Sequence, residues 1–531
     1  MVVPHEQARP CRPWLAHPVL FAWAPVLLLY AHNMAELHLG ELLLPLLLAT
    51  AAALAVWGLL RALLRDGTKA GVLASCFWLW FSSFGPVHSL ATRLSELVCP
   101  TLLLVYALAW PALLVLALDR KWGARHVSAA LNLMAVGLVL FSAARIGVYE
   151  WRRARAPASA LSSGSLPRPA GARQGEAPNI YFLVLDGYGR EDVLHDLYHC
   201  DNRDFLRSLE GEGFQVAPRA RANYAQTALS LASCLNLRYL EELPRLLGPK
   251  ATDRTPLGRA IDNNEMARFL RASGYRIVAF ASGYGGTEMR SADSYQRGRA
   301  GVSEFQSSLL EITPLPHLMR LLGVTGETDA HTRARQVLYT YDHLAQAGQS
   351  ARPVFVFAHI IAPHPPFIFR ADGSLKNDLP SAGFQDDTDL LGGREAYVQG
   401  YREQIEFITA RTRRAIQEIL ARAPRPTVIL LLSDHGPASR LVLYDVRQTD
   451  LRERFGILLA LRLPGKDLRI NDDLSPVNAC RLVLREYLGA DLPPLPSRSY
   501  FSNFDAPYRF TEVTDAQGRF RPFGPSGTKG R

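Results

Sequence analysis

The sequence predicts two unlike parts: a five-helix transmembrane domain, followed by an α/β domain whose mostly parallel sheet is covered by helices on both faces. Three observations carry this prediction. Five long apolar runs fill the first 150 residues, a stretch rich in Ala, Pro, Ser, Gly and Arg follows them, and short apolar runs then alternate with helical patterns. Since 531 residues exceed one ordinary domain, the 48% hydrophobic content is an average over these parts.

The composition shifts set the domain boundaries that we expect. The transmembrane domain covers residues 1–151, a flexible linker 152–178, the α/β domain 179–515 and a loose C-terminal tail 516–531. The linker lacks apolar periodicity, and this is typical of an exposed segment.

The apolar runs have the length of membrane spans. A helix rises about 1.5 Å per residue, so roughly 20 apolar residues cross a hydrocarbon core about 30 Å thick. A buried soluble bundle would show polar helix faces, and residues 42–60 show none. A cleavable signal peptide does not fit either, because the first run lacks a small-residue cleavage site and four more runs follow. The five runs are residues 15–35, 42–60, 70–90, 98–118 and 127–144.

Charges beside the runs predict the orientation, because Lys and Arg near span ends are retained in the cytoplasm. The loops on one side are rich in cations, and the opposite loops carry only His38 and Arg93. This places the N-terminus inside and everything beyond residue 150 outside, although three arginines after the fifth run oppose the rule. We therefore expect a multi-pass protein of the inner (cytoplasmic) membrane with a periplasmic or extracellular domain. The inside cations are Arg9, Arg12, Arg61, Arg65, Lys69, Arg120, Lys121 and Arg125, and the opposing ones are Arg152, Arg153 and Arg155.

Charge and cysteine content exclude two classes of protein. The net charge of +10 is not accompanied by a zinc-finger spacing, an RNA-binding motif or a basic helix with interleaved aromatics, so we expect no nucleic-acid partner. Contact with anionic lipid headgroups accounts for part of the excess. Six cysteines are too few for a disulfide scaffold. Cys200, Cys234 and Cys480 in the outer domain allow one pair, which the sequence does not choose.

The region after residue 179 has the alternation typical of an α/β domain. Near-continuous apolar strands separated by helices indicate a mostly parallel sheet covered on both faces, with the site at the carboxyl ends of the strands. The expected strands are residues 180–185, 275–281, 354–361, 428–432 and 455–461. The expected helices include residues 261–272, 333–345, 394–421 and 475–488.

Acidic residues follow two of these strands. Asp186 ends the first strand, in a sequence that a simple Asp-Gly turn would also explain. Asp434 and His435 end the fourth. Because both strand ends meet at one sheet edge, we expect the three side chains to converge. Carboxylates and imidazole suit a divalent ion such as Zn²⁺ or Mn²⁺.

Thr227 stands at the expected start of a helix between these strands. A Thr there is commonly an N-cap, which is one interpretation. The functional interpretation uses the same geometry, since the free N–H groups of a helix start favour bound phosphate, and a metal contact would make the hydroxyl a nucleophile.

Together these motifs resemble the alkaline phosphatase and sulfatase superfamily. Residues 179–190, 223–240, 359–367 and 433–436 look like its membrane-bound branch of sulfatase-like hydrolases and transferases. Lipoteichoic acid synthases and phosphoethanolamine transferases are similar in layout. The resemblance implies an α/β domain of alkaline phosphatase/sulfatase type, and it implies that Asp186, Thr227, Asp434 and His435 bind metal, with Thr227 also the nucleophile.

The resemblance also implies a role for the segment around residues 359–367. His364 fits a histidine that binds the substrate phosphate, and His359 fits less closely. By itself the segment would be a Pro-rich loop whose histidines only form hydrogen bonds.

Two departures from the family pattern bear on the subfamily. Lipoteichoic acid synthases and phosphoethanolamine transferases carry Glu where this chain has Asp186, whereas phosphatases and sulfatases carry Asp. A formylglycine sulfatase needs a Cys-x-Pro-x-Arg type motif. The run from Cys234 to Arg238 has Asn236 in place of the Pro, so we do not expect a formylglycine enzyme.

The resulting expectation is a metal-dependent phosphotransferase. It would move a phosphoethanolamine or phosphoglycerol type head group from a membrane lipid donor to a cell-envelope glycan or lipid, through a phospho-Thr227 intermediate. Two alternatives remain: a membrane-anchored phosphoester hydrolase with the same site, and a catalytically silent membrane scaffold.

Overall fold

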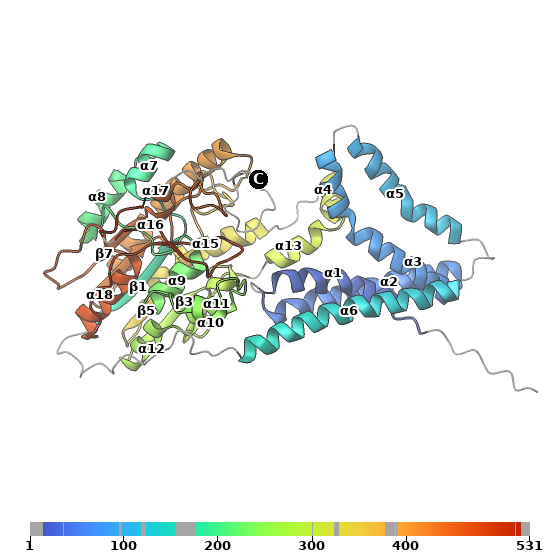
Figure 1. Ribbon diagram of the computed structural model, residues 1–531, viewed down its shortest axis with the longest axis horizontal. Helices are drawn as coiled ribbons and strands as arrows, with labels where there is room; N and C mark the ends of the chain where they lie inside the picture. Colours follow the sequence, from blue (N-terminus) through green and yellow to red (C-terminus); the bar gives the residue numbers. More distant parts are fainter. Residues whose placement is uncertain are drawn as a thin grey trace, which may run out of the picture. The chain divides into compact units, whose positions relative to one another are not determined.

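The computed structural model describes residues 14–34, 37–94, 98–117, 124–155, 177–299, 301–322, 329–376, 388, 391–515 and 517–521. Contacts divide the chain into two units (Figure 1). One unit, the membrane unit, comprises residues 1–155 together with 302–327, and the other, the α/β unit, comprises residues 156–301 and 328–531. Most of the predicted linker and most of the predicted tail lie outside the described residues.

All five apolar runs are helical in the membrane unit. The helix of the third run breaks at Ser83, and the last helix continues well past the fifth run. The helices are α1 His17–Asn33, the short 3₁₀ helix η1 Leu39–Leu42, α2 Leu43–Leu64, α3 Gly67–Ser82, α4 Phe84–Leu94, α5 Val98–Ala117 and α6 Ala124–Arg155.

Fewer than five of these helices have the dimensions of a complete span. Within the described residues, the continuous helix over residues 39–64 and α6 over 124–151 are long and apolar enough to cross a membrane. The pair α3 and α4, bent by 42°, makes a third if it counts as one span. Helix α1 has 17 residues and so is roughly 25 Å long. The structure thus supports two or three spans, and the count of five stays a prediction.

The membrane unit also contains a segment that the sequence places far away. Helices α13 Glu304–Glu311 and α14 Leu315–Leu321 follow strand β4 in the chain, yet their contacts are with the membrane helices. Nothing in their hydrophobicity distinguishes them from helices of the α/β domain.

The α/β unit is built on a seven-stranded sheet in the order β2-β7-β6-β1-β5-β3-β4. Strand β7 runs antiparallel to both neighbours, and the other described pairs are parallel. The prediction of a mostly parallel sheet is therefore confirmed. The strands are β1 Asn179–Leu185, β2 Phe214–Val216, β3 Arg276–Phe280, β4 Ser294–Gln296, β5 Val354–Ile360, β6 Thr427–Leu432 and β7 Leu459–Arg462.

One expected strand is shorter than its apolar run. Residues 455–461 contain the end of helix α17 Leu451–Phe455 and then the start of β7. Asp450 caps that helix by accepting a hydrogen bond from the N–H of Glu453, so local capping overrides the strand pattern.

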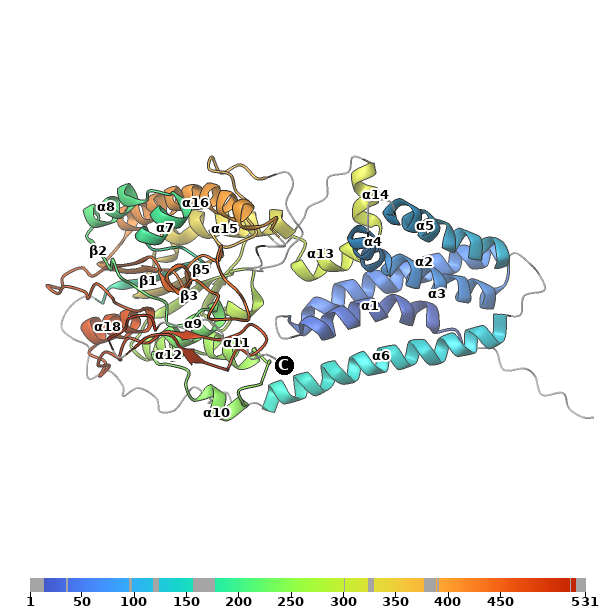
Figure 2. The same cartoon turned by 45° about the horizontal axis from the view of Figure 1, so that its top comes forward.

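Helices cover both faces of the sheet, as predicted (Figure 2). Alternate residues of β1 point to opposite faces, so Ile180 and Phe182 join one core and Tyr181 and Leu183 the other. The first core contains α9 Thr227–Leu235, α10 Leu243–Leu247, α11 Thr255–Asp262, α12 Glu265–Ala272 and α18 Pro476–Leu488. The second contains α7 Glu191–Tyr198, α8 Arg203–Gly211, α15 Asp329–Ala347 and α16 Arg394–Arg422. A small antiparallel pair, β8 Tyr500–Phe501 and β9 Thr511–Glu512, completes the unit.

Candidate active site

The predicted site residues meet at the carboxyl edge of three adjacent strands. Strand β1 lies between β6 and β5, and Asp186 follows it directly. Asp434 follows the end of β6, and His359 is the next-to-last residue of β5. All three side chains are buried. Burial of two carboxylates and an imidazole at one point is costly unless they share a proton or a cation.

Asp186 and His359 form the first contact. Asp186 Oδ2 lies 3.1 Å from Nε2 of His359. On the other side of the ring, Nδ1 lies 3.0 Å from the hydroxyl of Thr287, which donates its own proton to the carbonyl of Tyr284. The His359 N–H therefore donates to Thr287, and Nε2 turns its lone pair toward the carboxylate. Two acceptor atoms at this distance repel each other unless a proton or a metal ion lies between them.

His435 repeats this arrangement. Its Nδ1 lies 2.9 Å from the carbonyl oxygen of Gly436, which can only accept, so Nδ1 carries the proton. Nε2 then presents its lone pair to three oxygens: Oγ1 of Thr227 at 3.0 Å, Oδ2 of Asp434 at 3.4 Å and Oδ1 of Asp186 at 3.5 Å.

Thr227 is the first residue of helix α9, as predicted. Gln226 holds the N-cap position, and the Thr227 side chain bonds His435 rather than the helix backbone. The N-cap interpretation is thus wrong for this residue. Thr227 is half-buried, while its neighbours on the helix are buried. Ser230 one turn later donates to the carbonyl of Asp434 at 2.8 Å, fixing α9 against the end of β6.

His364 approaches from the loop after β5. Its backbone N–H donates to the carbonyl of Asp186 at 3.0 Å, and its ring centroid lies 6.0 Å from that of His435. Nδ1 donates to the carbonyl of Pro365 at 2.6 Å. Gln404 on α16 holds the loop by donating to the carbonyl of His364 at 3.0 Å.

The electrostatics of Asp186 favour its charged form. Burial by itself would raise the pKa of Asp186, but the neighbouring imidazoles of His364, His359 and His435 outweigh it and lower the pKa to about 2. The carboxylate is therefore available to a cation.

These side chains fit a divalent metal ion. Ligand atoms of Asp186, His364 and His435, and likewise of Asp186, His359 and Asp434, lie within 4.8 Å of one another. Oδ1 of Asp186 and Oδ2 of Asp434 are buried without a hydrogen-bond partner. Oxygen and nitrogen ligands about 2.0–2.2 Å from a tetrahedral Zn²⁺ lie about 3.3–3.6 Å apart, close to the separations around His435.

Cys234, the cysteine of the run compared above with a formylglycine motif, has the surroundings of a packing residue. Cys234 is 1% exposed inside α9, beside Cys480 of α18. Burial and the neighbouring thiol raise the pKa of Cys234 well above its ordinary value, so it is an unreactive packing residue. Of the three outer cysteines, only these two are neighbours, and both are free thiols.

Two supporting residues carried no signal in the sequence. Thr287 and Gln404 orient site residues or the loops that hold them, through hydrogen bonds that span up to 72 positions. Only their buried contacts reveal them, since Thr and Gln are common in surface turns and helices. Ser433, which lies within the motif 433–436, supports the same loop by donating to the carbonyl of His435.

Comparisons with known proteins return structural matches alone. No family model matches the chain, and no curated protein matches it. Integral membrane protein lipooligosaccharide phosphoethanolamine transferase A from Neisseria meningitidis matches at 12% identity and TM-score 0.39, covering 89% of this chain and 95% of that chain. The C-terminal periplasmic domain of EcEptC from Escherichia coli matches at 13% and 0.38, covering 64% and 94%.

A putative sulfatase from Bacteroides thetaiotaomicron matches at 12% identity and TM-score 0.40, with 63% of this chain and 75% of that chain covered. The matched structures thus include the kinds of protein that the sequence motifs resemble. At such identities and TM-scores the likeness carries no argument about activity, which rests on the geometry of the site.

Proposed function

We propose that this chain is a membrane-anchored, metal-dependent phosphotransferase with Thr227 as nucleophile. It transfers a phospho-head group of the phosphoethanolamine or phosphoglycerol type from a lipid donor to a cell-envelope glycan or lipid. One observation carries the proposal: the hydroxyl of the half-buried Thr227 lies 3.0 Å from His435 Nε2, beside a buried cluster of two carboxylates and three histidines.

The cluster supports metal binding by named residues. Asp186, Asp434 and His435 would hold the ion with Thr227, and His359 lies at the second oxygen of Asp186. When bound, a divalent ion supplies Lewis-acid activation of the hydroxyl and neutralises charge on the phosphoryl group. Zn²⁺ suits this mixed nitrogen and oxygen set, and Mn²⁺ is the alternative.

In the first step, Thr227 Oγ1 forms a bond to phosphorus and the bond from phosphorus to the lipid alcohol oxygen breaks. The hydroxyl proton of Thr227 passes to solvent and the lipid alcohol gains a proton from solvent, so the charge balances. His364 in its protonated form donates from Nε2 to a phosphoryl oxygen, and the N–H groups at the start of α9 face the same group.

In the second step, an acceptor hydroxyl attacks the phospho-Thr227 phosphorus and releases the threonine. Water as acceptor gives the hydrolase alternative with the same residues. The short carboxylate Asp186 is the feature that favours this alternative, since phosphatases carry Asp at the matching position. The buried and oriented cluster speaks against the silent scaffold, which needs none of it.

The membrane helices support a lipid donor. A site tethered to a bilayer meets lipid head groups at high effective concentration. We place the α/β unit outside the cytoplasm, periplasmic or extracellular, on the loop charges given above.

The test uses the purified full chain in vesicles containing head-group-labelled phosphatidylethanolamine or phosphatidylglycerol. We expect label on Thr227 in a rapid quench, and its transfer to an added glycan or lipid acceptor. Release of label to water at the same rate with and without acceptors would establish the hydrolase. Absence of any protein-bound label with active enzyme would contradict the covalent mechanism.

A further inference from the structure

The segment of α13 and α14 is fixed onto the membrane helices by three contacts. Phe305 is 3% exposed, and its ring lies 6.1 Å from that of Tyr30, edge to face. The N–H of Gly85 donates to the carbonyl of Ile312 at 3.0 Å. The ring of His317 lies 5.2 Å from that of Phe84. A segment that the chain supplies from the catalytic half is therefore a packed part of the membrane unit.

Gly85 shows how close this approach is. A Cβ at this position would lie 2.5 Å from the carbonyl oxygen of Glu311 and 2.7 Å from the Cα of Ile312. Both atoms belong to the backbone and cannot turn aside, so the contact depends on glycine.

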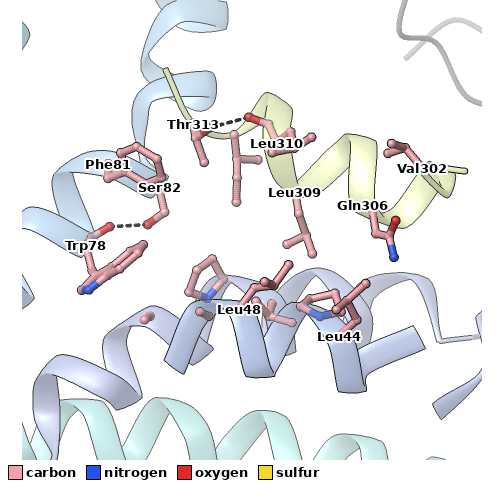
Figure 3. A pocket seen from close by; sticks show the side chains of 16 residues that line it. Leu44, Leu48, Trp78, Phe81, Ser82, Val302, Gln306, Leu309, Leu310 and Thr313 are labelled. Atoms are coloured by element: carbon pink, nitrogen blue, oxygen red, sulfur yellow. Dashed lines mark hydrogen bonds between the residues drawn. The ribbon is translucent and has the colours of Figure 1, made fainter. Parts of the chain in front are cut away.

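An apolar pocket of about 280 Å³ lies between α13 and helices α1, α2 and α3 (Figure 3). This volume is slightly below the range of typical ligand pockets, about 300 to 1,000 Å³. Leu309, Leu310 and Ile312 form the wall on the α13 side. The facing walls include Val26 of α1, Leu48 of α2 and Phe81 of α3.

The polar residues that line the pocket already use hydrogen-bonding groups within their own helices and turns. Ser82 donates to the carbonyl of Trp78 at 2.7 Å, and Thr313 donates to the carbonyl of Leu310 at 2.6 Å. The amide oxygen of Gln306 accepts from the backbone N–H of Ser303 at 3.2 Å, within a capping box. A head group would find little to bind here, whereas a hydrocarbon would leave no polar group unsatisfied.

The pocket is continuous with the surface that α2 presents to its surroundings. Leu44 and Leu48 line the pocket and are 52% and 60% exposed, and other leucines of the same helix are exposed beside them. In a helix long and apolar enough to cross a bilayer, such a surface contacts lipid chains. These neighbours are Leu43, Leu47, Leu54, Leu59 and Leu63.

We propose that this pocket binds one acyl chain of a membrane diacyl lipid. The pocket is too small for one turn of helix, which is about 10 Å wide and 5.4 Å long and fills roughly 400 Å³. A linear hydrocarbon chain needs less width, and it can place part of its length in the pocket and the rest along the exposed leucines of α2. That the bound lipid is the donor rests on the proposed function.

Binding is tested on the full chain in vesicles of phosphatidylethanolamine and phosphatidylglycerol, with a diazirine in one acyl chain of the phosphatidylethanolamine. Illumination and peptide mapping should place the label preferentially on residues 302–313 and on the facing part of α2. Leu309→Trp fills the pocket and should lower this labelling at least tenfold, and Ala49→Phe provides a second filling variant should the first fail to fold. Leu59→Trp, on the exposed surface of α2 outside the lining, is the matched control and should keep it.

The same labelling in the Thr227→Ala variant separates this inference from the proposed function, because binding needs no turnover. Three outcomes would overturn the lipid pocket. They are unchanged labelling in both filling variants, equal labelling of the pocket and of the surface around Leu59, and labelling by a diazirine fatty acid but not by the diacyl lipid. If labelling behaves as expected, the filling variants should also raise KM for the lipid donor while sparing turnover of a short-chain phosphodiester. An unchanged KM would overturn the donor assignment alone.

Discussion

Oγ1 of Thr227 lies 3.0 Å from Nε2 of His435, although 208 positions separate them in the chain. The contact joins the start of α9 to the end of β6, and it places the only half-buried hydroxyl of the cluster beside the nitrogen that also faces Asp186 and Asp434.

Thr227→Ala should abolish the covalent intermediate and lower kcat/KM by on the order of 10⁴-fold or more, as deletion of other nucleophiles does. Cys234→Ala is the matched control on the same helix. It removes only a packed sulfur and should cost about 1 kcal/mol of stability, with turnover kept. Mass spectrometry of enzyme trapped with substrate checks both. A modification on Cys234, or an active Thr227→Ala enzyme, would overturn the mechanism.

Asp434→Ala should empty the metal site, because it removes one of the two buried carboxylate oxygens that lack any other partner. Elemental analysis of the purified chain should show bound divalent metal in the wild type and little in the variant. When the free metal concentration is 100 times Kd, removing the metal with a chelator should lower the free energy of unfolding of the wild type by about 2.7 kcal/mol. The same treatment should leave the free energy of unfolding of the variant unchanged. The exposed Asp201→Ala serves as control. Undiminished metal in Asp434→Ala would refute the site.

Thr287→Val should weaken the site without touching substrate. The change keeps the shape of a fully buried side chain but removes the oxygen that accepts from His359 Nδ1, so the imidazole loses its orientation. Loss of such outer partners typically costs 10–100-fold in metal affinity or activity. Thr427→Val is matched, since that buried hydroxyl only donates to the carbonyl of Arg425. The metal affinities of the two variants are measured by titration. Equal affinities would count against the role of Thr287.

Gly436→Ala should destabilise the α/β unit. A Cβ there would lie 2.0 Å from the carbonyl oxygen of Glu453, a backbone atom, so the loop that carries His435 has to move. Overpacking of this kind costs about 1–3 kcal/mol, and a drop in Tm should accompany reduced metal binding. Gly211→Ala, with nothing within 4 Å of its Cβ, should leave Tm nearly unchanged. A Tm for Gly436→Ala equal to that of the wild type would contradict the prediction, because it would show that the loop accommodates the added Cβ without cost.

Reporter fusions check the orientation. A phosphatase reporter that works only outside the cytoplasm should be active when joined after residue 500, and a cytoplasmic reporter should be inactive there. The reverse pattern would reject the assignment drawn from the loop charges. A fusion after residue 66, in the cation-rich loop after the second run, should give the opposite result and serves as the internal control.

The sequence by itself determined the features that depend on local pattern. Apolar runs near 20 residues long predict membrane helices, and short buried runs ending in Asp186 and Asp434 predict strands whose ends share an edge. Thr227 begins its helix as predicted. These features can be predicted without knowing the rest of the fold, because hydrophobic periodicity and turn chemistry act over a few residues.

The tertiary structure decided what depends on packing between distant segments. Only the folded chain aims His435 Nε2 at Thr227, turns His359 toward Asp186 by way of Thr287, and sets strand β7 antiparallel between β2 and β6. It also assigns α13 to the membrane unit through the burial of Phe305 beside Tyr30. No local propensity encodes these relationships, because each arises from a contact whose two sides are far apart in the sequence and gain their energy only when both are buried together.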